Sequence, residues 1–211
     1  MKKLLHIIAS PREDESRTHK VSVFFLDSFK QSHADWIVEE INVFKENLPS
    51  LSVKKIDGKY MLLNGIELYG EYRQAWEEVI VQINRFLSAD GYLISTPMWN
   101  FSIPYPLKHY IDVIIQPKFL FNYTTEGKPE GLVKNKKMVI IATRGGDYSS
   151  QSAKETYDFQ IPYLRTIFGF VGLTDIKCII AEPMDALGPD TASTKIIQAQ
   201  QIAGEIAKNY F

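Results

Sequence analysis

The chain has 211 residues, 45% of them hydrophobic, and a formal net charge of −1. This composition is typical of a single globular domain and gives no electrostatic reason to expect nucleic acid or a membrane surface as a partner. One cysteine, Cys178, excludes a disulfide within the chain, and we find neither a leader pattern nor a run of roughly 20 apolar residues, so we expect a cytoplasmic protein.

Apolar segments of strand length alternate along the chain with segments of helical spacing. The first strand is expected at residues 4–9, and an apolar stripe through 21–29 predicts the helix that follows it. Residues 36–43 predict the second strand. Residues 44–75, which contain one proline and three glycines, predict a long and partly helical insertion.

A helix is expected over residues 75–86, then a strand at 91–95 and a helix at 107–114, with Pro106 in its first turn. Residues 116–132 carry aromatic side chains followed by turn signals, and they predict a hairpin or a protruding loop. Insertions of this length in α/β domains usually line a site or an interface.

The last two strands are expected at residues 138–143 and 176–181, and a stripe through 192–206 predicts the final helix. All the strands except the second are nearly continuous in apolar residues, which is typical of parallel strands buried on both faces. The sequence therefore predicts one doubly wound α/β domain over residues 1–211. Its core would be a flavodoxin-like five-stranded parallel sheet of order 2-1-3-4-5, with helices on both faces.

Ligands of an open α/β sheet bind at loops that follow the carboxyl ends of strands, and the first such loop reads SPREDESRT. It lacks the glycine patterns that hold a pyrophosphate, but it offers hydroxyls at Ser10, Ser16 and Thr18 beside Arg17. Ser16 or Thr18 would begin the helix, whose N–H groups and positive dipole end favour an anion. The loop therefore suits a terminal monophosphate, with the acids at 13–15 on a solvent-facing crest. An ordinary capped turn is the alternative.

The second loop, TPMWNFSIP, places Trp99, Asn100 and Phe101 between Pro97 and Pro104, directly after an expected buried strand. The prolines stiffen both ends of the loop, and exposed aromatic side chains there would suit a planar heterocycle. In the alternative interpretation, the aromatic side chains fill core beneath the insertion.

The third loop, TRGGDYSSQS, contains Gly145 and Gly146, which permit a close approach of the backbone to a ligand. Arg144 would face the electron-rich edge of a ring. A plain turn before the next helix would also use two glycines. Three such loops on one edge of one sheet together indicate a ligand site.

Four motifs stand in order between residues 98 and 172, within a similarity that runs from the first strand to the last helix: MWNFSIPYPLKHYID, FNYTTEGKPEGL, TRGGDY and PYLRTIFGFVG. With them the sequence resembles the FMN-dependent, NADH-utilising azoreductases, which are also described as quinone oxidoreductases. The resemblance implies a flavodoxin-like fold and a homodimer with FMN near the subunit interface. It also implies an enzyme that passes two electrons from NADH or NADPH through the flavin to quinones and aromatic azo compounds, in a ping-pong order.

Carried over by position, the resemblance implies a set of cofactor-binding residues. The first loop would surround the FMN phosphate, the second would lie along the isoalloxazine and the third would line its pyrimidine side. In chain order these residues are Ser10, Ser16, Arg17, Thr18, Pro97, Met98, Trp99, Asn100, Phe101, Thr143, Arg144, Gly145 and Gly146.

Two positions depart from the family. Ser-Gln-Ser is common in it where this chain has Ser16-Arg17-Thr18, and tyrosine is common where Trp99 stands. The arginine adds a positive charge beside the phosphate and should strengthen binding. The tryptophan keeps a flat surface but loses a hydroxyl.

Phe119, Phe121 and Tyr123 of the expected hairpin have two interpretations. They pack on their own domain, or they form a wall over the partner subunit's flavin that closes a flat pocket for an aromatic acceptor. Because the flavin carries the chemistry, no catalytic side chain is assigned, and no spacing of His, Cys and carboxylates resembles a metal site.

Two other functions stay open at this point. One is a flavodoxin-type electron carrier, which the near-neutral charge and the two insertions disfavour. The other is a quinone reductase that uses FAD, for which the sequence shows no adenosine site.

Overall fold

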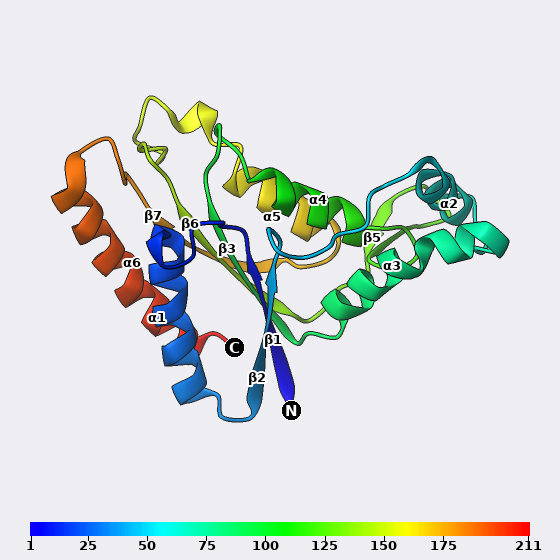
Figure 1. Ribbon diagram of the computed structural model, residues 1–211, viewed down its shortest axis with the longest axis horizontal. Helices are drawn as coiled ribbons and strands as arrows, with labels where there is room; N and C mark the ends of the chain where they lie inside the picture. Colours follow the sequence, from blue (N-terminus) through cyan, green and yellow to red (C-terminus); the bar gives the residue numbers. More distant parts are fainter.

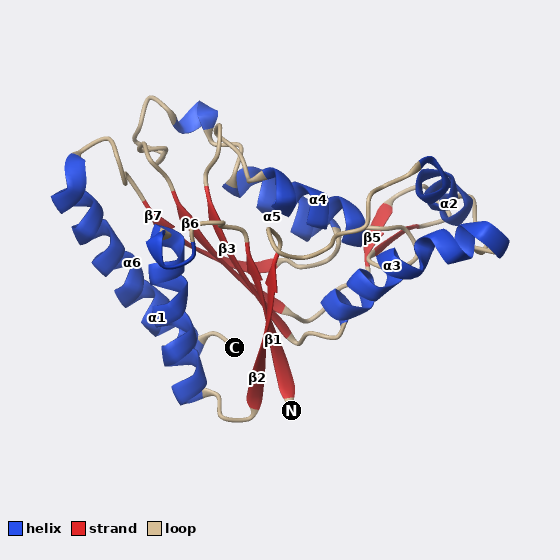
Figure 2. Ribbon diagram, in the orientation of Figure 1, coloured by secondary structure: helices blue, strands red, loops and turns tan.

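The computed structural model describes residues 1–211, apart from the side chain of Asp14. At its centre lies a parallel five-stranded sheet in the order β2-β1-β3-β6-β7 (Figures 1 and 2). Numbered among themselves, these strands have the predicted order 2-1-3-4-5, which confirms the predicted fold class. The strands are β1 (Lys2–Ile8), β2 (Trp36–Asn42), β3 (Gly91–Pro97), β6 (Lys137–Thr143) and β7 (Asp175–Ala181).

Helices cover both faces of this sheet, as the sequence predicted. On one face lie α1 (Arg17–Ser32) and α6 (Gly188–Asn209), which run side by side (Figure 1). The other face is covered by α3 (Gly70–Leu87), α4 (Tyr105–Ile114) and α5 (Ile161–Phe170). Each face therefore has its own hydrophobic core.

Neighbouring residues of β1 show why the strands are continuously apolar. Leu4 belongs to the core that contains Val21 and Phe25 of α1, whereas Leu5 belongs to the opposite core with Val79 of α3. Successive side chains of a strand point to opposite faces. Because both faces are covered, the central strands β1, β3 and β6 have no solvent-facing side for polar residues to occupy.

The first predicted insertion contains α2 (Val53–Leu63), which packs on α3. Trp76 of α3 is buried, and its indole Nε1 donates a hydrogen bond to the carbonyl oxygen of Lys55 at 3.0 Å. Gly58 makes room for the ring, because a Cβ at this position would lie 2.3 Å from Trp76 Nε1. The insertion is therefore a packed helical arm that extends away from the sheet (Figure 1).

The second predicted insertion is the expected hairpin, formed by the antiparallel strands β4 (Phe121–Tyr123) and β5 (Pro129–Gly131). Two short 3-10 helices, η1 (Glu13–Glu15) and η2 (Glu155–Tyr157), follow β1 and β6. In the part of the chain that the structure describes, no helix is long and apolar enough to cross a membrane.

A buried histidine joins three strands beneath α1. His6 of β1 is 1% exposed, and its Nε2 lies 2.9 Å from the hydroxyl oxygen of Ser95 on β3. Its Nδ1 lies 3.3 Å from a carboxylate oxygen of Glu40 on β2. Burial lowers the pKa of His6 below its ordinary value, because losing hydration disfavours the imidazolium more than Glu40 favours it.

This lowered pKa makes the stability of the fold depend on pH. As the pH falls through the ordinary histidine pKa of about 6.5, the unfolded chain takes up a proton that folded His6 does not yet accept. Neutral His6 therefore leaves the folded state at its full stability above that pH, and the folded state loses stability as the pH falls below it. We expect the free energy of unfolding, measured with urea between pH 7 and pH 5, to fall less steeply in a His6→Gln variant than in the wild type. Equal slopes in the two proteins would contradict this account.

Candidate functional site

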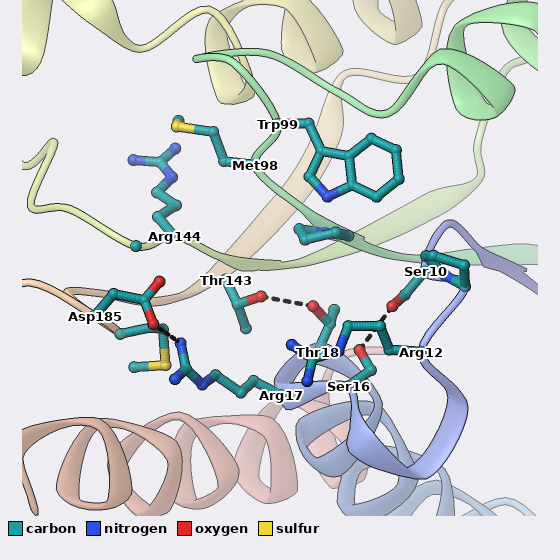
Figure 3. Close-up of a pocket in the computed structure, with 14 residues that line it drawn as sticks. Ser10, Arg12, Ser16, Arg17, Thr18, Met98, Trp99, Thr143, Arg144 and Asp185 are labelled. Carbon is teal, nitrogen blue, oxygen red and sulfur yellow. Dashed lines mark hydrogen bonds and ion pairs between the residues drawn. The ribbon is translucent and has the colours of Figure 1, made fainter. Parts of the chain in front are cut away.

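A cavity of about 190 Å3 opens at the carboxyl edge of the sheet, where the loops after β1, β3, β6 and β7 meet (Figure 3). The structure thus brings together the three predicted loops and adds a fourth. The lining residues are Ser10, Pro11, Arg12, Ser16, Arg17, Thr18, Pro97, Met98, Trp99, Thr143, Arg144, Gly145, Met184 and Asp185.

Buried hydroxyls surround the beginning of α1 at one end of the cavity. Ser16 caps the helix, since its hydroxyl accepts a hydrogen bond from the backbone N–H of His19 at 3.3 Å. Ser10 donates to the hydroxyl of Ser16 at 2.9 Å, and the hydroxyls of Thr18 and Thr143 lie 2.6 Å apart. Hydroxyls at a helix N-terminus form a donor set that fits a phosphate.

The two described acids of the first loop, Glu13 and Glu15, do not line the cavity. Glu13 and Glu15 are exposed in η1, and Glu13 pairs with Lys45 outside the cavity. The side chain of Asp14, expected on the same crest, lies outside the described part of the chain. Glu13 also lines a neighbouring hollow together with Ser10 and Ser16.

The second loop is a tight turn that holds aromatic side chains outside the core. The backbones of Trp99 and Ser102 exchange two hydrogen bonds of 2.9 Å, and the residues between them have positive φ, 46° at Asn100 and 70° at Phe101. Trp99 is 38% exposed and Phe101 is 45% exposed, so neither ring is buried in the core, although Trp99 packs edge-on against Phe44 of the first insertion, with centroids 5.6 Å apart. A phenylalanine held at positive φ is strained, which is common at functional sites.

Only part of this turn faces the cavity. Pro97, Met98 and Trp99 line it, whereas Asn100 lines a neighbouring hollow on the far side of Trp99. Phe101 packs its ring against Tyr148 and Tyr157 of the third loop region, with centroids 6.2 and 5.4 Å away. The second and third loops therefore support each other through ring contacts.

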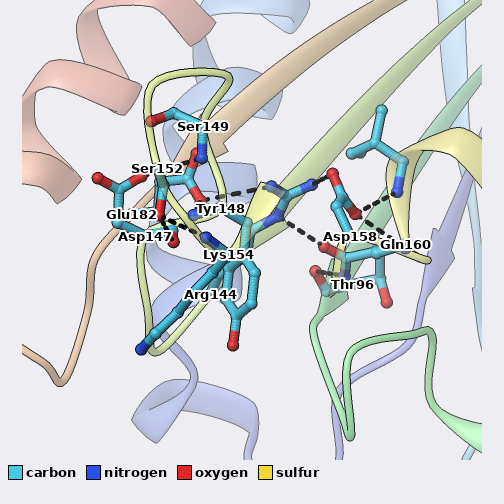
Figure 4. A network of polar contacts seen from close by, with 11 residues as sticks. Thr96, Arg144, Asp147, Tyr148, Ser149, Ser152, Lys154, Asp158, Gln160 and Glu182 are labelled. Carbon is cyan, nitrogen blue, oxygen red and sulfur yellow. Dashed lines mark hydrogen bonds and ion pairs between the residues drawn. The ribbon is translucent and has the colours of Figure 1, made fainter. Parts of the chain in front are cut away.

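The third loop is organised by the buried side chain of Arg144, which is 2% exposed (Figure 4). Its guanidinium group contacts Asp158 at 2.7 Å and Glu182 at 3.3 Å, and its Nε donates to the side-chain carbonyl of Gln160 at 3.1 Å. The guanidinium of Arg144 is thus paired with two carboxylates of the same chain, and these contacts fix the shape of the loop. Arg144 also lines the cavity, and its role at the edge of a ring stays a prediction.

The two glycines of the third loop lie directly under neighbouring side chains. A Cβ at Gly145 would lie 2.7 Å from the carboxylate of Asp185, and a Cβ at Gly146 would lie 3.2 Å from the ring of Tyr148. Gly145 lines the cavity, but Gly146 does not.

The fourth loop, after β7, is the part that sequence reasoning missed. Met184 donates its backbone N–H to the carbonyl oxygen of Arg144 at 2.8 Å, and Asp185 donates its own to that of Gly145 at 2.9 Å. The Asp185 carboxylate also forms an ion pair of 2.6 Å with Arg17. The rule that selected the loops after the first, third and fourth strands applies equally to the fifth strand and would have found this loop.

The aromatic residues of the hairpin do not line the cavity of their own chain. Phe119 stacks on Trp76 with centroids 6.3 Å apart, and Phe121 is buried against Phe170. Tyr123 is 49% exposed. Phe119 and Phe121 thus pack on their own domain, and a role over a partner's cofactor stays a prediction.

Comparison with known proteins identifies the family. A model of proteins with the flavodoxin-like fold matches residues 2–206. The chain belongs to this flavodoxin-like family. Among its curated relatives, the FMN-dependent NADH:quinone oxidoreductase of Nitratidesulfovibrio vulgaris (strain DP4) is 37% identical over 210 residues, which cover 100% of both chains. A protein of the same name from Clostridium beijerinckii is 37% identical over 214 residues, again across 100% of both.

Solved structures of azoreductases share the fold of this flavodoxin-like chain. The azoreductase from Bacillus anthracis str. Sterne matches with a TM-score of 0.89 and 31% identity, covering 100% of both chains. An FMN-dependent NADH-azoreductase from Bacillus anthracis str. Ames Ancestor, solved in complex with FMN, matches with a TM-score of 0.84 and 29% identity over 98% of this chain and 100% of that one. These matches confirm the resemblance that the motifs indicated.

The buried Arg144 network predicts a large loss of stability when the guanidinium is removed. In an Arg144→Met variant, Asp158 and Glu182 would remain mostly buried without their counter-ion, which costs about 3–5 kcal/mol. Urea unfolding measures this loss. The matched control is Arg12→Met, at an exposed arginine on the cavity rim, for which we expect a change within about 0.5 kcal/mol. Similar losses in both variants would contradict a structural role for Arg144.

Proposed function

We propose that the protein is an FMN-dependent oxidoreductase that passes two electrons from NADH or NADPH to quinones and aromatic azo compounds. One observation carries this proposal: a single cavity has buried hydroxyls at a helix N-terminus at one end and a rigid, partly exposed tryptophan turn at the other. A monophosphate fits the first feature, and a flat ring fits the second. The names of the relatives support the same cofactor and substrates.

FMN, when bound, supplies the redox chemistry, and the residues of this chain position it. Ser10, Ser16 and Thr18, together with the N–H groups of α1, would hold the phosphate, and Arg17 stands within reach of it. Met98 and Trp99 would flank the ring, while the backbone of Gly145 would approach its polar edge. No side chain is assigned as a proton donor, because water can supply the protons.

We propose that the nicotinamide and the acceptor use the same open face of the flavin ring in turn, which gives ping-pong kinetics.

We propose that a homodimer closes this face of the ring. In support, the hollow beside Trp99 has a volume of about 610 Å3 and is also lined by Leu51, Ile103 and the exposed Tyr105. Of the hairpin aromatics, Tyr123 is exposed enough to contact a partner, and Phe119 and Phe121 would anchor its strand.

We also propose a cytoplasmic location, which the single cysteine supports.

The cofactor is tested by releasing any bound chromophore from the purified protein with acid and identifying it. We expect FMN rather than FAD or riboflavin. Oxidation of NADH, or of NADPH, should then depend on added menadione or methyl red. A protein that takes up no flavin would overturn the proposal. Flavin uptake without acceptor-dependent turnover would instead indicate an electron carrier.

An Arg17→Ala variant tests the first loop. Of the parts of FMN, only the phosphate would interact with the charge of Arg17, and riboflavin lacks this phosphate. We therefore expect FMN affinity to fall roughly ten-fold while riboflavin affinity stays nearly unchanged. Quenching of flavin fluorescence by the apoprotein measures both affinities. Lys20→Ala removes the same charge from an exposed position of α1 and should leave both unchanged. Equal losses for FMN and riboflavin in Arg17→Ala would show that this loop does not hold the phosphate.

A further inference from the structure

We infer that Asp185 is a positioning residue for Arg17 and limits how strongly the protein binds the phosphate of its cofactor. In the free protein the Asp185 carboxylate forms an ion pair with the Arg17 guanidinium. A phosphate can pair with Arg17 only when this ion pair breaks. This inference rests on the proposed FMN site and adds a determinant of affinity that lies outside the phosphate loop.

The two side chains meet across one side of the cavity from distant parts of the chain. Arg17 is the first residue of α1, and Asp185 lies in the loop between β7 and α6. Figure 3 shows them pointing toward one another, and Arg17 Nη1 lies 2.6 Å from Asp185 Oδ1. Both residues line the cavity that holds the hydroxyls of Ser16 and Thr18. A phosphate at those hydroxyls would therefore lie beside a guanidinium that already has an anionic partner.

The loop that carries Asp185 is anchored to the third site loop. The backbone N–H groups of Asp185 and Ala186 both donate to the carbonyl oxygen of Gly145, at 2.9 and 3.1 Å. The carboxylate lies over Gly145, whose missing side chain leaves the space that it occupies. The anchored backbone keeps the Asp185 carboxylate beside Arg17. The ion pair is therefore part of the site, unlike a pair between two mobile surface side chains.

The charges of the pair decide its effect on an incoming phosphate. Carboxylate and phosphate groups both match the planar donor fork of a guanidinium, and a phosphate monoester carries the larger negative charge near neutral pH. Arg17 and Asp185 are partly exposed, with 37% and 67% of their side-chain surfaces accessible, and exposed ion pairs are weak. The Arg17 guanidinium can therefore leave Asp185 and pair with the phosphate. The affinity for the phosphate is reduced, however, because the ion pair with Asp185 is lost and because the unpaired Asp185 carboxylate repels the phosphate.

The test is an Asp185→Asn variant. It keeps the shape of the side chain and removes the charge, so Arg17 becomes free for the phosphate. We expect FMN to bind to the apoprotein about three- to ten-fold more tightly and riboflavin to bind with unchanged affinity, both measured by flavin fluorescence at low salt. The gain should shrink at 0.5 M salt, about the concentration at which exposed charges are largely screened. In the Arg17→Ala background the same change should have little effect.

A matched control separates this mechanism from general electrostatics. Asp190→Asn makes the same change at an exposed carboxylate in the first turn of α6 that does not line the cavity, and we expect no change in the ratio of FMN to riboflavin affinity. An equal gain in Asp190→Asn, an equal gain of Asp185→Asn in the Arg17→Ala background, or a loss of FMN affinity in Asp185→Asn would each overturn the inference. A wild-type protein that binds neither flavin would instead refute the proposed function.

Discussion

The site depends on one buried ionic cluster. The guanidinium of Arg144 pairs with Asp158, which precedes α5, and with Glu182, which follows β7. It also donates a hydrogen bond to the side-chain carbonyl of Gln160. Taking these charges out of water is costly, and the cost is met only while every partner is in place. The cluster therefore fixes three separate segments of chain in one arrangement, and the cavity takes its shape from that arrangement.

The other loops are attached to this cluster in different ways. The turn at Trp99 is connected through its neighbour Phe101, whose ring and carbonyl oxygen contact the segment 148–159. The hydroxyls at the start of α1 are connected through the contact between Thr18 and Thr143, the last residue of β6, which directly precedes Arg144. The loop of Asp185 is attached through Glu182, whose carboxylate pairs with Arg144, and through backbone hydrogen bonds from Met184 and Asp185. A charged core surrounded by weaker contacts leaves the outer groups able to adjust to a ligand while the frame stays fixed.

Much of the fold could be predicted because its signals are local. Nearly continuous apolar runs identified four of the five parallel strands. Ser16 or Thr18 was expected to begin the first helix from its place before an apolar stripe, and the structure shows that Ser16 is the cap. The partners of Arg144 could not be predicted, because Asp158 and Glu182 lie 14 and 38 residues away along the chain and no spacing rule joins them. The role assigned to Gly145 from sequence was close approach to a ligand. The structure adds that the residue also accommodates Asp185, a contact that exists only because β7 lies beside β6.

The turn at Trp99 has a consequence for how such a protein changes over time. Its shape is set by the two backbone hydrogen bonds between Trp99 and Ser102, and the rings that it carries are partly in solvent. At Phe101 the positive φ penalises one aromatic residue about as much as another, so replacing one aromatic ring with another adds little to the backbone strain. Side chains at the mouth of the cavity can therefore vary without repacking of the hydrophobic core. Such a protein can acquire new acceptor preferences by single substitutions while its fold stays the same.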